Sequence, residues 1–206
     1  MVELFLNSLV LFFVVIDPIG TIAIFLSILP NIKGNKRNIA LESVLYAFLI
    51  LVFFMLLGRI ILNHLNISLY AFKIAGGIIL LLIAIEMLLN KRVKRRAQVM
   101  KDEKPAVTAI FPLAVPLLAG PAAITSVIVS SSNIKSNLNM YIINIFALFL
   151  VLLITLATFL LAIKYEKYIN TKFLEVLSRI ISILLCALSI QFILDGLSEF
   201  YLDVKK

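Results

Sequence analysis

The residues best suited to chemistry in this chain are Asp17-Pro18-Ile19-Gly20, which lie in the middle of a long apolar segment. A carboxylate near the centre of a bilayer costs about 2.5–3.5 kcal/mol even on lenient insertion scales. Proline removes a backbone donor and interrupts the i→i−4 hydrogen bonds of a helix. Broken backbone is tolerated at membrane depth only where protein or water satisfies it. The pattern therefore predicts a discontinuous helix that lines a polar cavity.

A second interruption of the same kind, Ala119-Gly120-Pro121-Ala122-Ala123, lies in another apolar segment. When Pro18 is aligned with Pro121, Thr21 and Thr125 both fall about one turn into the segment that follows. Identity between the two stretches is weak, but the breaks occur at corresponding places. Paired breaks of this kind mark the binding site in the two halves of secondary transporters.

Each break is predicted to start a new half-helix, because Asp is a favoured N-cap and Pro is favoured at the first helical position. A helix N-terminus offers backbone N–H groups and about half a positive charge to an anion. Asp17 can cap its own half-helix, whereas Gly120 has no side chain, so its half-helix keeps its donors. We expect the carboxylate of a small zwitterion, such as an α-amino acid, at Gly120 and its ammonium group at Asp17.

The predicted substrate site thus comprises both breaks and the residues one turn beyond them: Asp17, Pro18, Ile19, Gly20, Thr21, Ala119, Gly120, Pro121, Ala122, Ala123 and Thr125. Asp17 could instead carry the proton or sodium ion that drives transport; no other cofactor is expected. The alternative is a purely structural kink in which Asp17 acts only as an N-cap.

The elements that must position these residues are six apolar segments, each near the 20 residues that a spanning helix needs. They cover roughly 3–29, 39–62, 68–89, 106–132, 138–163 and 173–200. The predicted fold is an all-α membrane protein with one domain, 1–206. It has two three-helix repeats, 1–89 and 106–206, joined by loop 90–105, with discontinuous helices 1 and 4. Three spans per repeat require the second repeat to be inverted relative to the first.

The composition and the placement of charged residues predict a multi-pass membrane protein. Hydrophobic residues make up 63% of the 206 residues, and charged residues only 15%. The loops after spans one, three and five hold three, seven and three of the 19 basic residues. The positive-inside bias therefore predicts that loop 90–105 is cytoplasmic and that both termini lie outside a cell membrane. A net charge of +8 confined to loops predicts contact with the lipid bilayer and no binding of nucleic acid.

Catalytic and metal-binding arrangements are not predicted. His64 is the only histidine and Cys186 the only cysteine, which excludes a His-based zinc site and an intrachain disulfide. No Ser/Lys, paired-Asp or His/Glu arrangement lies at a common membrane depth, so we expect no enzyme.

Three motifs in order, 16–20 (IDPIG), 72–78 (FKIAGGI) and 114–125 (AVPLLAGPAAIT), resemble those of the MarC family of integral membrane proteins. The resemblance covers nearly the whole chain. It implies kinship with archaeal transporters of glycine and alanine and with the LysE-type exporters. One departure is that Ala122 stands where the family often has glycine, which narrows the space at the second break. The expected function is therefore a secondary transporter of small neutral amino acids that works by alternating access. The alternative is a channel or a structural membrane protein without transport activity.

Overall fold

The computed structural model describes residues 1–28, 35–89, 109–132, 138–165, 169 and 171–205. These residues form seven α-helices and one π-helical segment, and the described part of the chain contains no strand. The elements are α1 (Val2–Ile16), α2 (Pro18–Ile28), α3 (Lys36–His64), α4 (Leu69–Leu88), η4 (Ala109–Leu118), α6 (Pro121–Ser132), α7 (Leu138–Tyr165) and α8 (Thr171–Val204). The predicted cytoplasmic loop 90–105 lies outside the described residues.

Five stretches of the described chain are long and apolar enough to cross a membrane: Val2–Leu26, Lys36–His64, Leu69–Leu88, Leu138–Tyr165 and Phe173–Val204. The sequence predicts six. The sixth, predicted over 106–132 with an interruption at Gly120-Pro121, is not among the five, because its described residues form η4 and the shorter apolar helix Pro121–Ser132. The all-helical prediction and the membrane-length helices are confirmed.

Local sequence explains where the long helices begin. The side chain of Asn35 accepts a hydrogen bond from the N–H of Arg37 at 3.1 Å and caps α3. The hydroxyl of Ser68 accepts one from the N–H of Ala71 at 3.3 Å and caps α4. Large apolar side chains remain exposed along α3, α4, α7 and α8, as expected of helices whose outer faces contact lipid rather than water.

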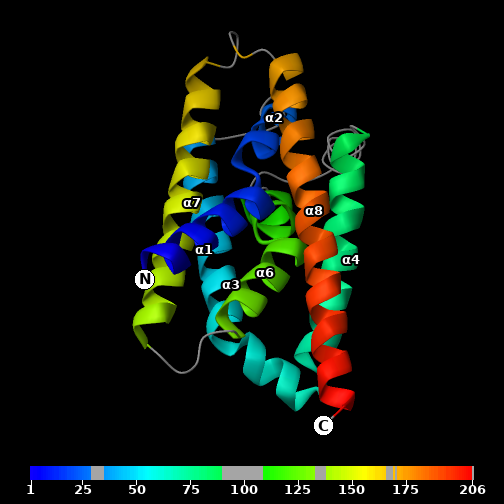
Figure 1. Ribbon diagram of the computed structural model, residues 1–206. Coiled ribbons are helices and arrows are strands. Elements are labelled where there is room, and N and C mark those ends of the chain that lie inside the picture. The colour runs from blue at the N-terminus through cyan, green and yellow to red at the C-terminus, as the bar shows by residue number, and fades with distance from the viewer. Residues whose placement is uncertain (29–34, 90–108, 133–137, 166–168, 170, 206) are drawn as a thin grey trace.

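Helices α4 and α8 form a closely packed pair along one side of the bundle (Figure 1). A β-carbon on Gly77 would lie 2.7 Å from the carbonyl oxygen of Ser189, and one on Gly196 would lie 2.7 Å from that of Tyr70. Small residues at these crossings let the two backbones approach, which is how membrane helices gain packing energy without a hydrophobic driving force between them.

An ion pair reinforces this contact between α4 and α8. The ammonium group of Lys73 lies 2.5 Å from a carboxylate oxygen of Glu199, and the Lys73 side chain is only 4% exposed. The charge of Lys73 is therefore paired, in the last turns of α8, with Glu199, whose side chain is 44% exposed.

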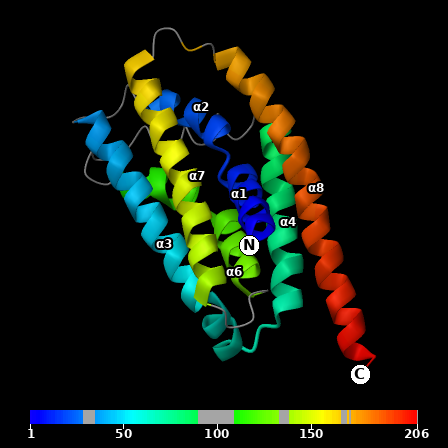
Figure 2. The ribbon, with the colours of Figure 1, turned by 60° about the vertical axis from the view of Figure 1, so that its left-hand side comes forward.

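The two breaks lie among the four long helices, whereas the N-terminal half of α1 is mostly exposed at the edge of the bundle (Figures 1 and 2). Helices α1 and α2 both pack on α7, and η4 and α6 both pack on α3. Helix α2 also contacts α8, and α6 contacts α4. The long helices therefore hold both breaks in the interior of the bundle.

Candidate functional site

Asp17 is the joint between α1 and α2. It has φ 51° and ψ 69°, in the left-handed region that Asp enters more readily than most residues. Its N–H closes α1 by donating to the carbonyl of Phe13 at 3.0 Å, and its carbonyl accepts the N–H of Thr21 at 2.9 Å. One residue thus ends one helix and begins the next, and the chain changes direction between them (Figure 1).

The Asp17 side chain caps α2, as the sequence predicts. The N–H of Gly20 donates to Asp17 Oδ1 at 3.0 Å, which satisfies one of the donors at the start of the helix. Side chains leave little space around Gly20. A β-carbon on Gly20 would lie 1.9 Å from Asp17 Oδ2 and 2.8 Å from the hydroxyl of Ser178 on α8. The carboxylate is therefore held between its own helix start and α8.

The second break has a different construction. The N–H of Ala119 ends η4 by donating to the carbonyl of Ala114, five residues earlier, at 2.8 Å. Helix α6 begins at Pro121, and the N–H of Ile124 donates to the carbonyl of Gly120 at 3.0 Å. Gly120 has no side chain with which to cap α6. Within the described chain, no side-chain oxygen takes the place that the Asp17 carboxylate occupies at the start of α2.

The two breaks lie against one another. Helix α1 contacts α6, and α2 contacts η4. From the breaks, α2 and α6 run toward opposite ends of the bundle (Figure 1). Both helix N-termini therefore point toward the interior, which gives it two partial positive charges. The Asp17 carboxylate offsets only the one at α2.

The structure buries most of the predicted site residues together. Ile19 is half-buried and Pro121 is exposed, and the other nine are buried: Asp17, Pro18, Gly20, Thr21, Ala119, Gly120, Ala122, Ala123 and Thr125. The exposure of Pro121 makes the start of α6 the accessible part of this region.

The two threonines bond their own helices. The Thr21 hydroxyl lies 2.9 Å from the carbonyls of both Asp17 and Pro18, and the Thr125 hydroxyl donates to the carbonyl of Pro121 at 2.9 Å. Both hydroxyls thus donate within their own helices, as Ser and Thr side chains in helices often do. A solute would have to compete for them.

Two residues outside the predicted site also belong to it. Ser178 of α8 contacts the first turn of α2, as described above. A β-carbon on Gly76 of α4 would lie 2.0 Å from the methyl carbon of Thr125 on α6. Each half-helix is therefore approached closely by one long helix, at a glycine. The Gly76-Gly77 pair was a visible signal for close contact, whereas nothing about Ser178 distinguishes it from other small residues in the sequence.

Comparison with known proteins gives consistent results. Residues 2–201 match the family described as MarC family integral membrane protein. A UPF0056 membrane protein of Methanocaldococcus jannaschii is 35% identical over 191 residues, which cover 90% of this chain and 91% of the relative. One from Aquifex aeolicus is 31% identical over 200 residues, with 95% and 93% coverage. No solved structure matches.

Proposed function

The chain belongs to the MarC family of integral membrane proteins, and we propose that it is a secondary transporter of small neutral amino acids, with its substrate site where the two breaks meet. The observation that carries this proposal is the pair of helix starts, Pro18 and Pro121, that open inside the bundle and run in opposite directions. Helix starts at mid-membrane direct backbone donors at anionic groups of a solute.

An inverted repeat is supported by the pattern of contacts. Exchanging the halves exchanges α1 and α2 with η4 and α6, α3 with α7, and α4 with α8. The contacts of α1 and α2 with α7 then become those of η4 and α6 with α3, and the contact of α2 with α8 becomes that of α6 with α4. Two structurally equivalent halves can exchange conformations, and this exchange is what alternating access requires.

The charge difference between the breaks favours a zwitterion. Asp17 supplies a negative charge that is partly satisfied by the N–H of Gly20. The start of α6 supplies backbone donors without a side-chain cap, and its first residue, Pro121, is exposed. An α-amino acid would place its carboxylate at α6 and its ammonium at Asp17. The small side chains of Ala119, Ala122 and Ala123 would restrict the site to glycine-like or alanine-like solutes.

The proposal also covers the ion that drives transport and the orientation of the protein in the membrane. Asp17 is the carboxylate that a proton or sodium ion would bind if transport is driven by an ion gradient. The basic loops would lie in the cytoplasm and both termini outside the cell membrane. No chemical transformation of the solute is included, so the protein would not act as an enzyme.

The test is uptake of labelled glycine and alanine into proteoliposomes. Gly120→Leu places a branched side chain where the solute carboxylate would lie, so uptake should fall to background. Ala157→Leu adds the same side chain at an exposed position of α7 and should leave uptake unchanged. Both variants should elute as folded, monodisperse protein. Unchanged uptake by folded Gly120→Leu would contradict the proposed site.

Counterflow then separates a carrier from a channel. Unlabelled glycine inside the vesicles should accelerate uptake of labelled glycine through a carrier, because the loaded site returns faster than the empty one. Flux without this acceleration would indicate a channel, and absence of flux for every amino acid would contradict transport altogether.

A further inference from the structure

A crevice with a volume of about 490 Å³ lies between α1 and α8. Its lining includes Asn7, Val10 and Val14 of α1 and Ala187, Leu188 and Gln191 of α8. From Asn7 to Val14 it follows α1 for about 10 Å, and Val14 lies about one turn before Asp17. The crevice therefore leads along α1 toward the first break. Its volume falls in the range of small-molecule sites.

Helix α8 places a polar pair at this crevice. The Gln191 amide donates to the Asp195 carboxylate at 2.7 Å, and both side chains are exposed. Helix α8 has 34 residues and is about 51 Å long, so a hydrocarbon layer about 30 Å thick and centred on it would include both. Polar side chains at such depth face protein or a water-filled cavity, because lipid would leave them unsatisfied.

The corresponding surface of the other half is closed. In the register that aligns Pro18 with Pro121, Val10 corresponds to Leu113 and Leu11 to Ala114. Val10 is 60% exposed, whereas Leu113 and Ala114 are both fully buried. The segment before Pro18 is therefore accessible, whereas the segment before Pro121 is not. The two halves of an inverted-repeat carrier differ in this way when the carrier is open to only one side of the membrane.

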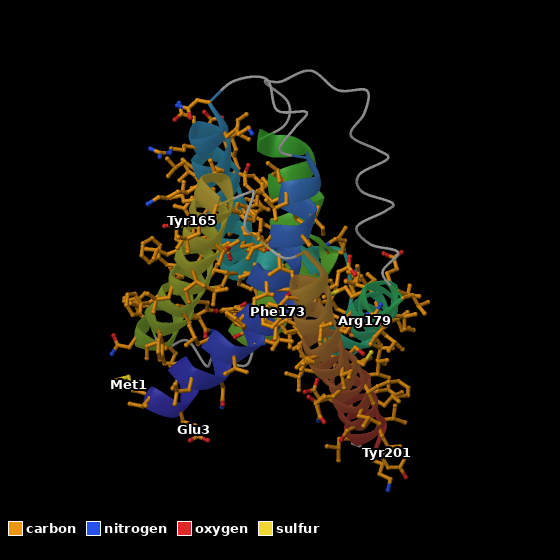
Figure 3. All side chains as sticks on the ribbon, turned by 90° about the horizontal axis from the view of Figure 1, so that it is seen from above. Met1, Glu3, Tyr165, Phe173, Arg179 and Tyr201 are labelled. Carbon is orange, nitrogen blue, oxygen red and sulfur yellow. The ribbon has the colours of Figure 1, made fainter. Side chains whose placement is uncertain are left out.

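We propose that the crevice between α1 and α8 is the water-filled access path by which a small zwitterionic solute reaches the breaks. This inference rests on the proposed function. The carboxylate of Asp195 near the path would attract the ammonium group of the solute. In the opposite conformation this path closes and the surface around Leu113 and Ala114 opens. Figure 3 shows Met1 and Glu3 at the outer end of α1, the end from which the path begins.

Cysteine reactivity tests this path. Cys186 is the only cysteine, so Cys186→Ser gives a background without thiols. In that background Ala187→Cys places a thiol in the crevice. Ile183→Cys, one turn away, places one at a position that is 59% exposed but does not line the crevice. A charged, membrane-impermeant methanethiosulfonate reacts with thiolate in water. In proteoliposomes it should therefore modify Ala187→Cys at least tenfold faster than Ile183→Cys.

Modification of Ala187→Cys should also block glycine uptake, and Gln191→Cys serves as a second crevice position if the first variant folds poorly. Equal rates at crevice and control positions would overturn the inference. So would labelling of Ala187→Cys by a lipid-borne photoreactive acyl chain with no reaction in water, which would mean that lipid fills the crevice. Reaction at the crevice in a protein that transports no amino acid would leave the hydrated path standing and refute the proposed function. Transport of glycine by a protein whose crevice cysteine does not react would support the proposed function and refute the hydrated path.

Discussion

Substitution of Gly20 by alanine tests the geometry of the first break most directly. The new methyl group would lie 1.9 Å from Asp17 Oδ2, 2.8 Å from Asp17 Cγ and 2.8 Å from the hydroxyl of Ser178. The carboxylate must move, and it then loses its hydrogen bond from the N–H at position 20. Loss of an N-cap costs about 1 kcal/mol, and an extra methyl group in a packed interior costs about 1–3 kcal/mol.

Gly20→Ala should therefore lower the free energy of unfolding by about 2–4 kcal/mol, roughly a 30- to 1,000-fold change in the folding equilibrium. Reversible unfolding in mixed SDS micelles measures this difference. Glycine uptake should fall as well, because the Asp17 carboxylate no longer occupies its position at the break.

A double-mutant cycle identifies the group responsible. In an Asp17→Ala background the carboxylate is absent, so adding Gly20→Ala should cost much less than it does in the wild type. In a Ser178→Gly background, by contrast, Gly20→Ala should still lower the free energy of unfolding by most of the amount seen in the wild type. The reason is that the new methyl group would lie closer to Asp17 than to Ser178. If Gly20→Ala stays within about 0.5 kcal/mol of the wild type, the range of a neutral surface change, the inferred packing around Asp17 is wrong.

Two further predictions concern polar pairs that join the long helices. Glu199→Gln leaves the buried ammonium of Lys73 without its counter-ion and should destabilise the protein by about 1–3 kcal/mol. Adding Lys73→Met to Glu199→Gln should recover part of this loss, because it removes the unpaired charge. A larger loss of stability in the double variant would show that an unpaired Lys73 charge is not the cause. The buried hydroxyl of Ser8 on α1 donates to the side-chain oxygen of Asn144 on α7, and Asn144 Nδ2 has no hydrogen-bond partner among the described residues. Ser8→Ala should therefore cost about 1–3 kcal/mol in the same unfolding assay, while Ser8→Ala with Asn144→Leu should cost less than Ser8→Ala alone.

Several features of the fold follow from the sequence because they depend on short-range chemistry. Proline cannot continue a helical hydrogen-bond ladder wherever the chain is placed, so Pro18 and Pro121 each begin a helix. Asp17 caps α2 through a bond that reaches only three residues along the chain. The long apolar stretches become membrane-length helices because their backbone groups must pair within the segment. The break at Gly120-Pro121 lies where the sequence predicts it, whereas the segment before the break forms the π-helical turns of η4, a geometry that the sequence analysis does not predict.

The arrangement of the site depends on contacts between residues far apart in the chain. The sequence by itself determined the helices, both breaks, the cap at Asp17 and the membrane class, since each follows from propensity, hydropathy or a hydrogen bond within a few residues. Only the tertiary structure decided that Ser178 packs against Gly20, that Thr125 packs against Gly76, and that a crevice lies between α1 and α8. Packing between helices depends on the shapes of both surfaces at once, and no periodicity along one segment records the shape of its partner.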